Sequence, residues 1–103
     1  MLILNQTPSD KITDSTGQPY FVWDQRITLE EVEDGLRNPD PDVRVRFLGR
    51  LMRDARPDDV FLFVDADQIA FDWQKVAPFL GRKREFWTWL LGVWGYLPEP
   101  DAR

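Results

Sequence analysis

Cysteine and histidine are both absent from the 103-residue chain. Their absence excludes disulfide bonds, thiolate nucleophiles, zinc sites built on either residue, and histidine as a general base. Long hydrophobic runs are also absent. The longest uncharged stretch, residues 86–98, is shorter than the roughly 20 residues that a membrane-spanning helix needs. The N-terminus has no basic region and only a very short apolar run, unlike a signal peptide. We therefore expect a cytoplasmic protein that does not enter the membrane.

Acidic residues outnumber basic ones, and the formal net charge is −5. The acidic excess lies in residues 1–42, whereas residues 43–84 are basic. An acidic protein is a poor general binder of nucleic acid, because such binding depends on cations that neutralise phosphates. The same charge suits contact with a basic protein surface. We therefore expect a protein partner rather than nucleic acid.

The spacing of apolar residues predicts a mainly α protein. We expect a compact domain of four to five helices with a HEAT-like helical hairpin and an irregular aromatic N-terminal segment. Residues 1–18 are expected to form an N-terminal arm, whose flexibility the pattern leaves open. Residues 19–97 form the helical domain, and residues 98–103 form a C-terminal tail. A chain of this length buries only about 60–70% of its unfolded surface, so some aromatic surface could need a partner to cover it.

The helical hairpin has clear end signals. Thr28 and Glu31 are spaced as a capping box, in which each side chain bonds to the other residue's backbone amide. Asp40 is a natural N-cap and Pro41 a natural first residue of the second helix. These signals predict helices over residues 28–37 and 41–55. Their expected core positions are Leu29, Val32 and Leu36 in the first, and Val43, Phe47, Leu48, Leu51 and Ala55 in the second.

The middle of the chain is more ambiguous. Residues 60–64 are all apolar and fit a buried strand, but Pro57 followed by two aspartates favours a short helix. Asp65 and Asp67 have the spacing of carboxylates that bind Mg²⁺, yet no phosphate-binding glycine loop or third carboxylate accompanies them. Asp65 is better explained as the N-cap of the next helix. We therefore predict no metal site and no cofactor.

The last helix is apolar nearly all round. Phe86, Trp89 and Val93 would share one face, whereas Trp87 and Trp94 would point elsewhere. A surface helix of a small domain needs only one apolar stripe. The helix must therefore be central to the core or bury its second face against another molecule. The aromatic residues predicted to contact a partner are Tyr20, Trp23, Trp87, Trp94 and Tyr96.

The basic residues predicted to contact a partner are Arg46, Arg50, Arg53, Arg82, Lys83 and Arg84. The first three follow helical spacing on one face of the second helix. They form either a solvated stripe with local pairs such as Arg50–Asp54, or a docking face for an acidic partner or RNA. Residues 82–84 open the last helix, where the helix dipole disfavours positive charge. They are either solvated or the polar rim of a binding surface.

Three blocks of sequence together resemble a known family: Pro19–Asp24, Arg46–Val60 and Arg84–Trp87. The chain resembles small bacterial proteins encoded beside abortive-infection-type nucleotidyltransferases, which look like the antitoxin half of a toxin–antitoxin pair. The resemblance covers about residues 19–90. It implies a non-catalytic protein that binds and neutralises a nucleotidyltransferase toxin, whose triphosphate and RNA groove is basic.

Two other functions remain open from the sequence. One is a HEAT-like helical adaptor or regulator that binds a different protein. The other is a nucleic-acid-binding transcriptional regulator that uses the two groups of basic residues. An enzyme is not expected, because no set of catalytic groups can be assembled. The tryptophan-rich surface could also pair with a second copy of the chain to form a homodimer.

Overall fold

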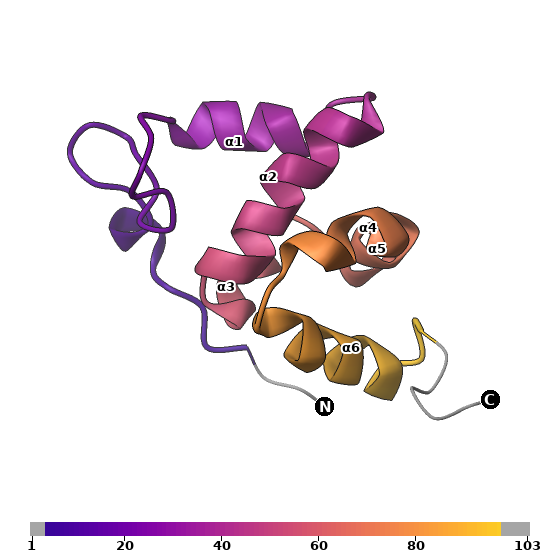
Figure 1. Ribbon diagram of the computed structural model, residues 1–103. Helices are drawn as coiled ribbons and strands as arrows, with labels where there is room; N and C mark the ends of the chain where they lie inside the picture. Colours follow the sequence, from indigo (N-terminus) through magenta and orange to yellow (C-terminus); the bar gives the residue numbers. More distant parts are fainter. Residues whose placement is uncertain (1–3, 98–103) are drawn as a thin grey trace.

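The computed structural model describes residues 4–97, and this part of the chain is mainly helical (Figure 1). The α-helices are α1 Leu29–Leu36, α2 Pro41–Asp54, α3 Pro57–Val60, α4 Ala66–Phe71, α5 Trp73–Val76 and α6 Lys83–Val93. Two 3₁₀ turns, Ser9–Lys11 and Ala77–Phe79, complete the regular structure. The predicted mainly α fold is confirmed, and the described residues contain no strand beyond an isolated bridge between Thr13 and Pro19.

The predicted helix ends are confirmed where they depend on neighbouring residues. Thr28 and Glu31 form the capping box, with the Glu31 amide donating to the Thr28 hydroxyl at 3.2 Å. The Asp40 side chain caps α2 by accepting from Asp42, and Pro41 is its first residue. Gly95, which follows α6, has φ of 84°, a conformation that residues with a side chain rarely adopt.

The region between α2 and α6 contains more helices than expected. The predicted number of four to five helices is too small, because residues 57–79 divide into three short α-helices and a 3₁₀ turn. Pro57 starts α3, which ends at Val60 and leaves the next three residues in turns. Asp65 caps α4 by accepting from Gln68, as predicted. Pro78 lies in the 3₁₀ turn after α5, because its ring has no N–H to continue an α-helix.

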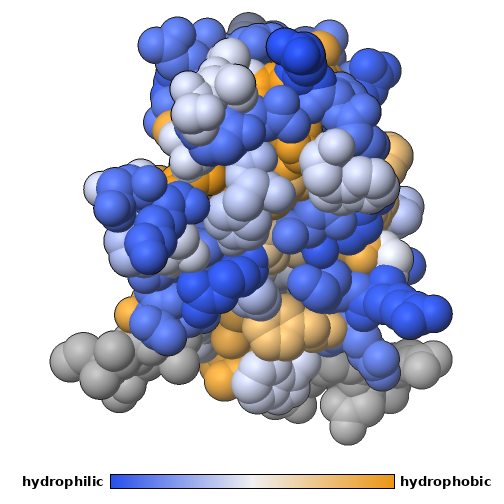
Figure 2. Space-filling view, turned by 90° about the vertical axis from the view of Figure 1, so that its left-hand side faces the viewer, coloured by the Kyte–Doolittle hydropathy of each residue, from blue (hydrophilic) through white to orange (hydrophobic). Residues whose placement is uncertain are grey.

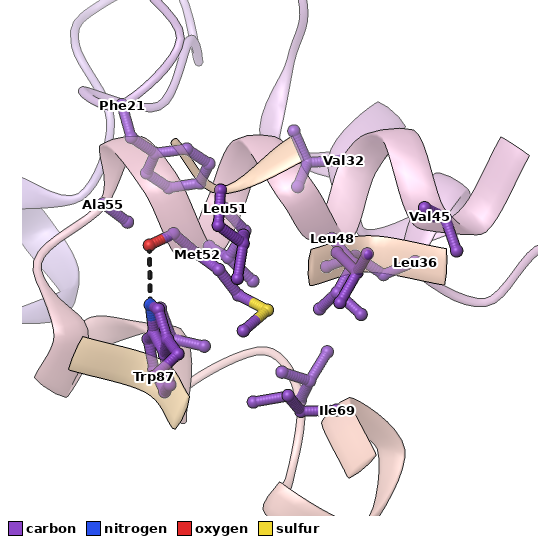
Figure 3. Packing of buried hydrophobic residues seen from close by; sticks show 14 of the residues in the cluster. Phe21, Val32, Leu36, Val45, Leu48, Leu51, Met52, Ala55, Ile69 and Trp87 are labelled. Carbon is purple, nitrogen blue, oxygen red and sulfur yellow. Dashed lines mark hydrogen bonds between the residues drawn. The ribbon is translucent and has the colours of Figure 1, made fainter. Parts of the chain in front are cut away.

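Helix α2 is the centre of the core. It forms the predicted hairpin with α1 at one end and extends toward α6 at the other (Figure 1). Leu48, Leu51 and Met52 are fully buried, with Trp87 of α6 on one side and Ile69 of α4 on the other (Figure 3). The predicted stripe is partly wrong. Val43 and Phe47 are only half-buried, because the inward face of α2 is centred on Val45, Leu48 and Met52.

The N-terminal segment packs along the helices without forming a helix of its own beyond one 3₁₀ turn. Phe21 and Val22 are buried and join the core, whereas Trp23 is exposed. Residues 5–7 lie against the start of α3, where the Asn5 amide donates to Asp58 at 2.8 Å. The arm predicted over residues 1–18 is therefore tied to the helical domain within its described part, residues 4–18. The predicted tail, residues 98–103, lies outside the described residues.

Candidate protein-interaction surfaces

Helix α6 has one apolar face in the core and a second one in solvent. Trp87, Leu90 and Leu91 point inward and are buried. Trp89 and Val93 point outward and are 58% and 64% exposed. Phe86 is half-buried beside them, with its ring centroid 6.1 Å from that of Trp89. We call Phe86, Trp89 and Val93 the outer face of α6.

Trp87 was predicted to contact a partner, and that prediction is wrong because its side chain is fully buried. Its indole N–H donates to the Met52 carbonyl at 2.9 Å, as Figure 3 shows. A buried tryptophan needs such an acceptor, and the last turn of α2 supplies one. The exposed tryptophan of α6 is instead Trp89, which was not among the residues predicted to contact a partner.

Trp94 and Tyr96 lie just beyond the end of α6. Trp94 is half-buried, and its ring centroid lies 5.4 Å from that of Phe61. Tyr96 is partly exposed, and both residues line a shallow depression with Leu4 and Val64. These two predicted contact residues thus lie near the surface, although Trp94 also packs against the hydrophobic core.

The basic residues at the start of α6 are at the surface. Arg82 and Arg84 are exposed and Lys83 is half-buried. Within residues 4–97 none of the three takes part in an ion pair. They are free to meet an acidic or phosphate-bearing group, as well as solvent.

The arginines of α2 differ from one another in their environment. Arg50 is largely covered and donates to Asp24 and to Asp54, the latter at 2.9 Å, so the expected Arg50–Asp54 pair is confirmed. Arg53 also donates to Asp54 at 3.3 Å. Burial alone would raise the pKa of Asp54, but the bonds from Arg53 and Arg50 outweigh it and hold that pKa below its usual value. Arg46 is exposed and forms no ion pair with any residue the structure describes.

A cavity of about 320 Å³ opens between residues 21–27 and α2. Its apolar lining includes Phe21, Val22 and Phe47, and its polar lining includes Arg46 and Arg50. Trp23, which follows Val22, is 76% exposed. Two predicted contact residues, Arg46 and Arg50, thus line this cavity, and Trp23 belongs to the segment that forms its other wall.

Tyr20 was also predicted to contact a partner, but its hydroxyl is hydrogen-bonded within the protein, at the buried carboxylate of Asp59. It donates to Asp59 at 2.5 Å and accepts from the Arg56 amide at 2.9 Å. Thr7 donates to the same carboxylate through its amide at 2.7 Å and its hydroxyl at 2.6 Å. Asp59 is fully buried, and sequence reasoning missed this site because its donors lie 39 and 52 residues away.

The pKa values at this site follow from those contacts. Burial alone would raise the pKa of Asp59, but the hydrogen bonds from Thr7 and Tyr20 outweigh it and hold the pKa below its usual value of 3.8. Burial, together with the bond to Asp59, raises the pKa of Tyr20 to about 12. The carboxylate is therefore ionised and the phenol neutral near pH 7, which keeps the donors and acceptor matched.

The face that carries the N-terminal segment is mostly hydrophilic, with hydrophobic residues reaching the surface in separate patches (Figure 2). Among residues 4–97 there is no group of three or more carboxylates placed to hold a metal ion, and Asp65 is engaged in capping α4. No helix within the described range is long and apolar enough to cross a membrane.

Comparison with known proteins finds no match: no family model, no curated protein and no solved structure matches this chain.

Proposed function

We propose that this protein is a non-catalytic interaction module that binds a partner protein through the outer face of α6. The observation that carries the proposal is the exposure of Trp89 and Val93 on a helix whose opposite face is already buried. Fully burying one large apolar side chain contributes about 1.5–3 kcal/mol. Tryptophan is also among the residues that dominate binding energy at protein interfaces. A partner that covers this face would therefore gain affinity from a small area.

The partner we propose is a nucleotidyltransferase-type toxin, which the chain would hold inactive as an antitoxin. Two features support this choice. The first is the resemblance of Pro19–Asp24, Arg46–Val60 and Arg84–Trp87 to proteins encoded beside such enzymes. The second is the net charge of −5, whose acidic excess lies in residues 1–42 and suits the basic groove of an enzyme that binds triphosphate and RNA. Occlusion of that groove needs no catalytic group on this chain.

The test is co-expression of the chain with the product of the neighbouring gene. We expect the two proteins to co-purify and the toxicity of the nucleotidyltransferase to be relieved. Trp89→Ala should weaken binding by about 30-fold, the effect of losing a 2 kcal/mol contact, and should restore toxicity. Because Trp89 is exposed, this variant should unfold at nearly the same temperature as the wild type.

Phe71→Ala is the matched control. Phe71 is an aromatic residue on α4 that is 82% exposed, so its truncation removes a similar amount of apolar surface from a different element. We expect it to leave co-purification and growth unchanged. If the neighbouring product neither co-purifies nor loses toxicity, the antitoxin function is refuted. If it binds equally well to Trp89→Ala, the outer face of α6 is not the docking site.

A further inference from the structure

The cavity beside α2 has a different chemistry from the outer face of α6, and it lies at the other end of the molecule. It is lined by residues 21–27, by Val32 of α1 and by α2. In Figure 1 the start of α1 and the loop before it lie far from α6. A ligand in this cavity would therefore leave the outer face of α6 uncovered.

The floor of the cavity is apolar and preformed. Phe21, Val22 and Val32 are core residues, held by packing on their other sides, and Ile27 and Phe47 are half-buried around them. The volume of about 320 Å³ is at the lower end of the range for ligand sites and is enough for one aromatic side chain. Apolar floors of this kind bind apolar groups, whereas orientation comes from polar groups at the mouth.

The mouth of the cavity carries two guanidinium groups in different states. Arg50 is fixed by Asp24 and Asp54, so its charge is already balanced. Arg46, one helical turn earlier, is exposed and has no ion-pair partner among the described residues. Gln25 also lines the cavity and offers a neutral amide donor. Positive charge is thus available at one edge of an apolar cavity.

We propose that this cavity binds a peptide segment of a partner protein in which an aromatic residue is followed by an acidic one. The aromatic side chain enters between Phe21 and Phe47, and the adjacent carboxylate bonds to Arg46. The guanidinium fork matches a carboxylate and gives both charge and direction to the contact. A nucleic acid fits less well, because Arg46 is the one unpaired cation that the described residues place at the cavity, whereas a phosphate backbone needs several. The site is separate from α6, so its test can fail without affecting the proposed function.

The test uses the full chain, labelled with ¹⁵N and with ¹³C-methyl groups, and three blocked dipeptides as probes. N-acetyl-phenylalanyl-glutamyl amide has both groups, the glutaminyl analogue lacks only the charge, and the alanyl-glutamyl analogue lacks only the ring. We expect the first to bind most tightly and to shift the methyl signals of Val22 and Ile27. Arg46→Gln should weaken its binding by about tenfold, the effect of one charge-assisted hydrogen bond, and should not change binding of the glutaminyl analogue.

Arg53→Gln is the matched control, since Arg53 lies on the same helix but does not line the cavity. It should leave all three affinities unchanged. Equal affinity for the glutamyl and glutaminyl dipeptides, or shifts confined to other elements, would overturn the proposal. So would the absence of binding by every probe. A shift of the Val22 and Ile27 signals with protein concentration alone, accompanied by a doubled mass in sedimentation, would assign the cavity to a second copy of the chain instead.

Discussion

At the scale of single residues, Asp59 is the more deeply buried of the two carboxylates, Asp59 and Asp72, that are buried among the described residues. It is fully buried, yet its carboxylate accepts three short hydrogen bonds, two from Thr7 and one from Tyr20. Arg56 lies 3.9 Å away and adds charge compensation. A buried carboxylate is costly unless it is bonded and paired in this way. Asp59 therefore stabilises the fold only while all of its donors are in place.

Asp59→Asn should lower the free energy of unfolding by about 2–4 kcal/mol. The amide keeps the shape of the carboxylate but turns an acceptor into a donor, which then faces the hydrogens of Thr7 or Tyr20. Urea denaturation at pH 7 measures the change. Asp58→Asn is the matched control, because this neighbour is not fully buried and, within residues 4–97, its side chain accepts from the Asn5 amide alone. It should cost less than about 1 kcal/mol, and equal costs for both variants would contradict the argument.

Ionisation of the Tyr20 phenol should make the free energy of unfolding fall at alkaline pH. Its folded pKa is raised to about 12 from an ordinary value of 10.0, so it contributes stability that is complete below pH 10. That contribution is lost as pH rises from 10 through 12, because the phenolate would face the Asp59 carboxylate. The wild type should therefore lose more stability than Tyr20→Phe between pH 9.5 and 11.5, which denaturation at fixed pH measures. A constant difference between the two proteins would refute this.

At the scale of elements, local sequence patterns predict where helices begin and end. Contacts between residues distant in sequence determine which face of a helix is buried. The Thr28 capping box, Asp40 with Pro41, and the Asp65 cap each depend on residues within one turn, so the sequence shows them directly. The face of α6 is different. Both sides of that helix are apolar. Trp87 is on the inward side, where its indole N–H donates to the carbonyl of Met52, 35 residues away. Helical spacing contains no information about that acceptor.

The close contact between α1 and α2 gives a prediction for the hairpin. Gly35 is buried in α1, and a Cβ atom there would overlap the ring of Phe47. Gly35→Ala should therefore lower the free energy of unfolding by about 1–3 kcal/mol, although alanine favours a helix by about 1 kcal/mol over glycine. Thermal denaturation followed by circular dichroism measures the change.

Gly92→Ala is the matched control for the hairpin. Gly92 also lies inside a helix, α6, but beyond its chain neighbours and its own helix backbone no atom of the described residues lies within 4 Å of the position that a Cβ would occupy. This variant should be as stable as the wild type or more stable by up to about 1 kcal/mol. Stabilisation by both substitutions would mean that α1 and α2 are not in close contact through Gly35.

At the scale of the whole molecule, polar contacts hold together segments that are distant in sequence. Arg44 of α2 binds Asp72 through two bonds, of 2.7 and 2.8 Å, and so connects the hairpin to the start of α5. Asp59 connects α3 to the N-terminal segment through Thr7 and Tyr20. The sequence does not reveal either connection, since an aspartate at a helix start is normally solvated. The apolar pattern of the sequence predicts that the helices pack together. The bonds to Asp72 and Asp59 help to fix the positions of α5 and of the N-terminal segment against them.

Removal of residues 1–7 tests whether the N-terminal segment is part of the folded unit. It deletes both Thr7 donors and leaves the buried Asp59 carboxylate with Tyr20 as the one close donor that the described part of the chain still supplies. We expect a loss of about 2–3 kcal/mol in the free energy of unfolding. In the Asp59→Asn background the same truncation should cost at least about 1 kcal/mol less, because the contact it breaks is already lost. Thr7→Val, which keeps the length of the segment, should show the same direction of coupling. Costs that add to within about 0.5 kcal/mol would show that the segment is held by other contacts than Asp59.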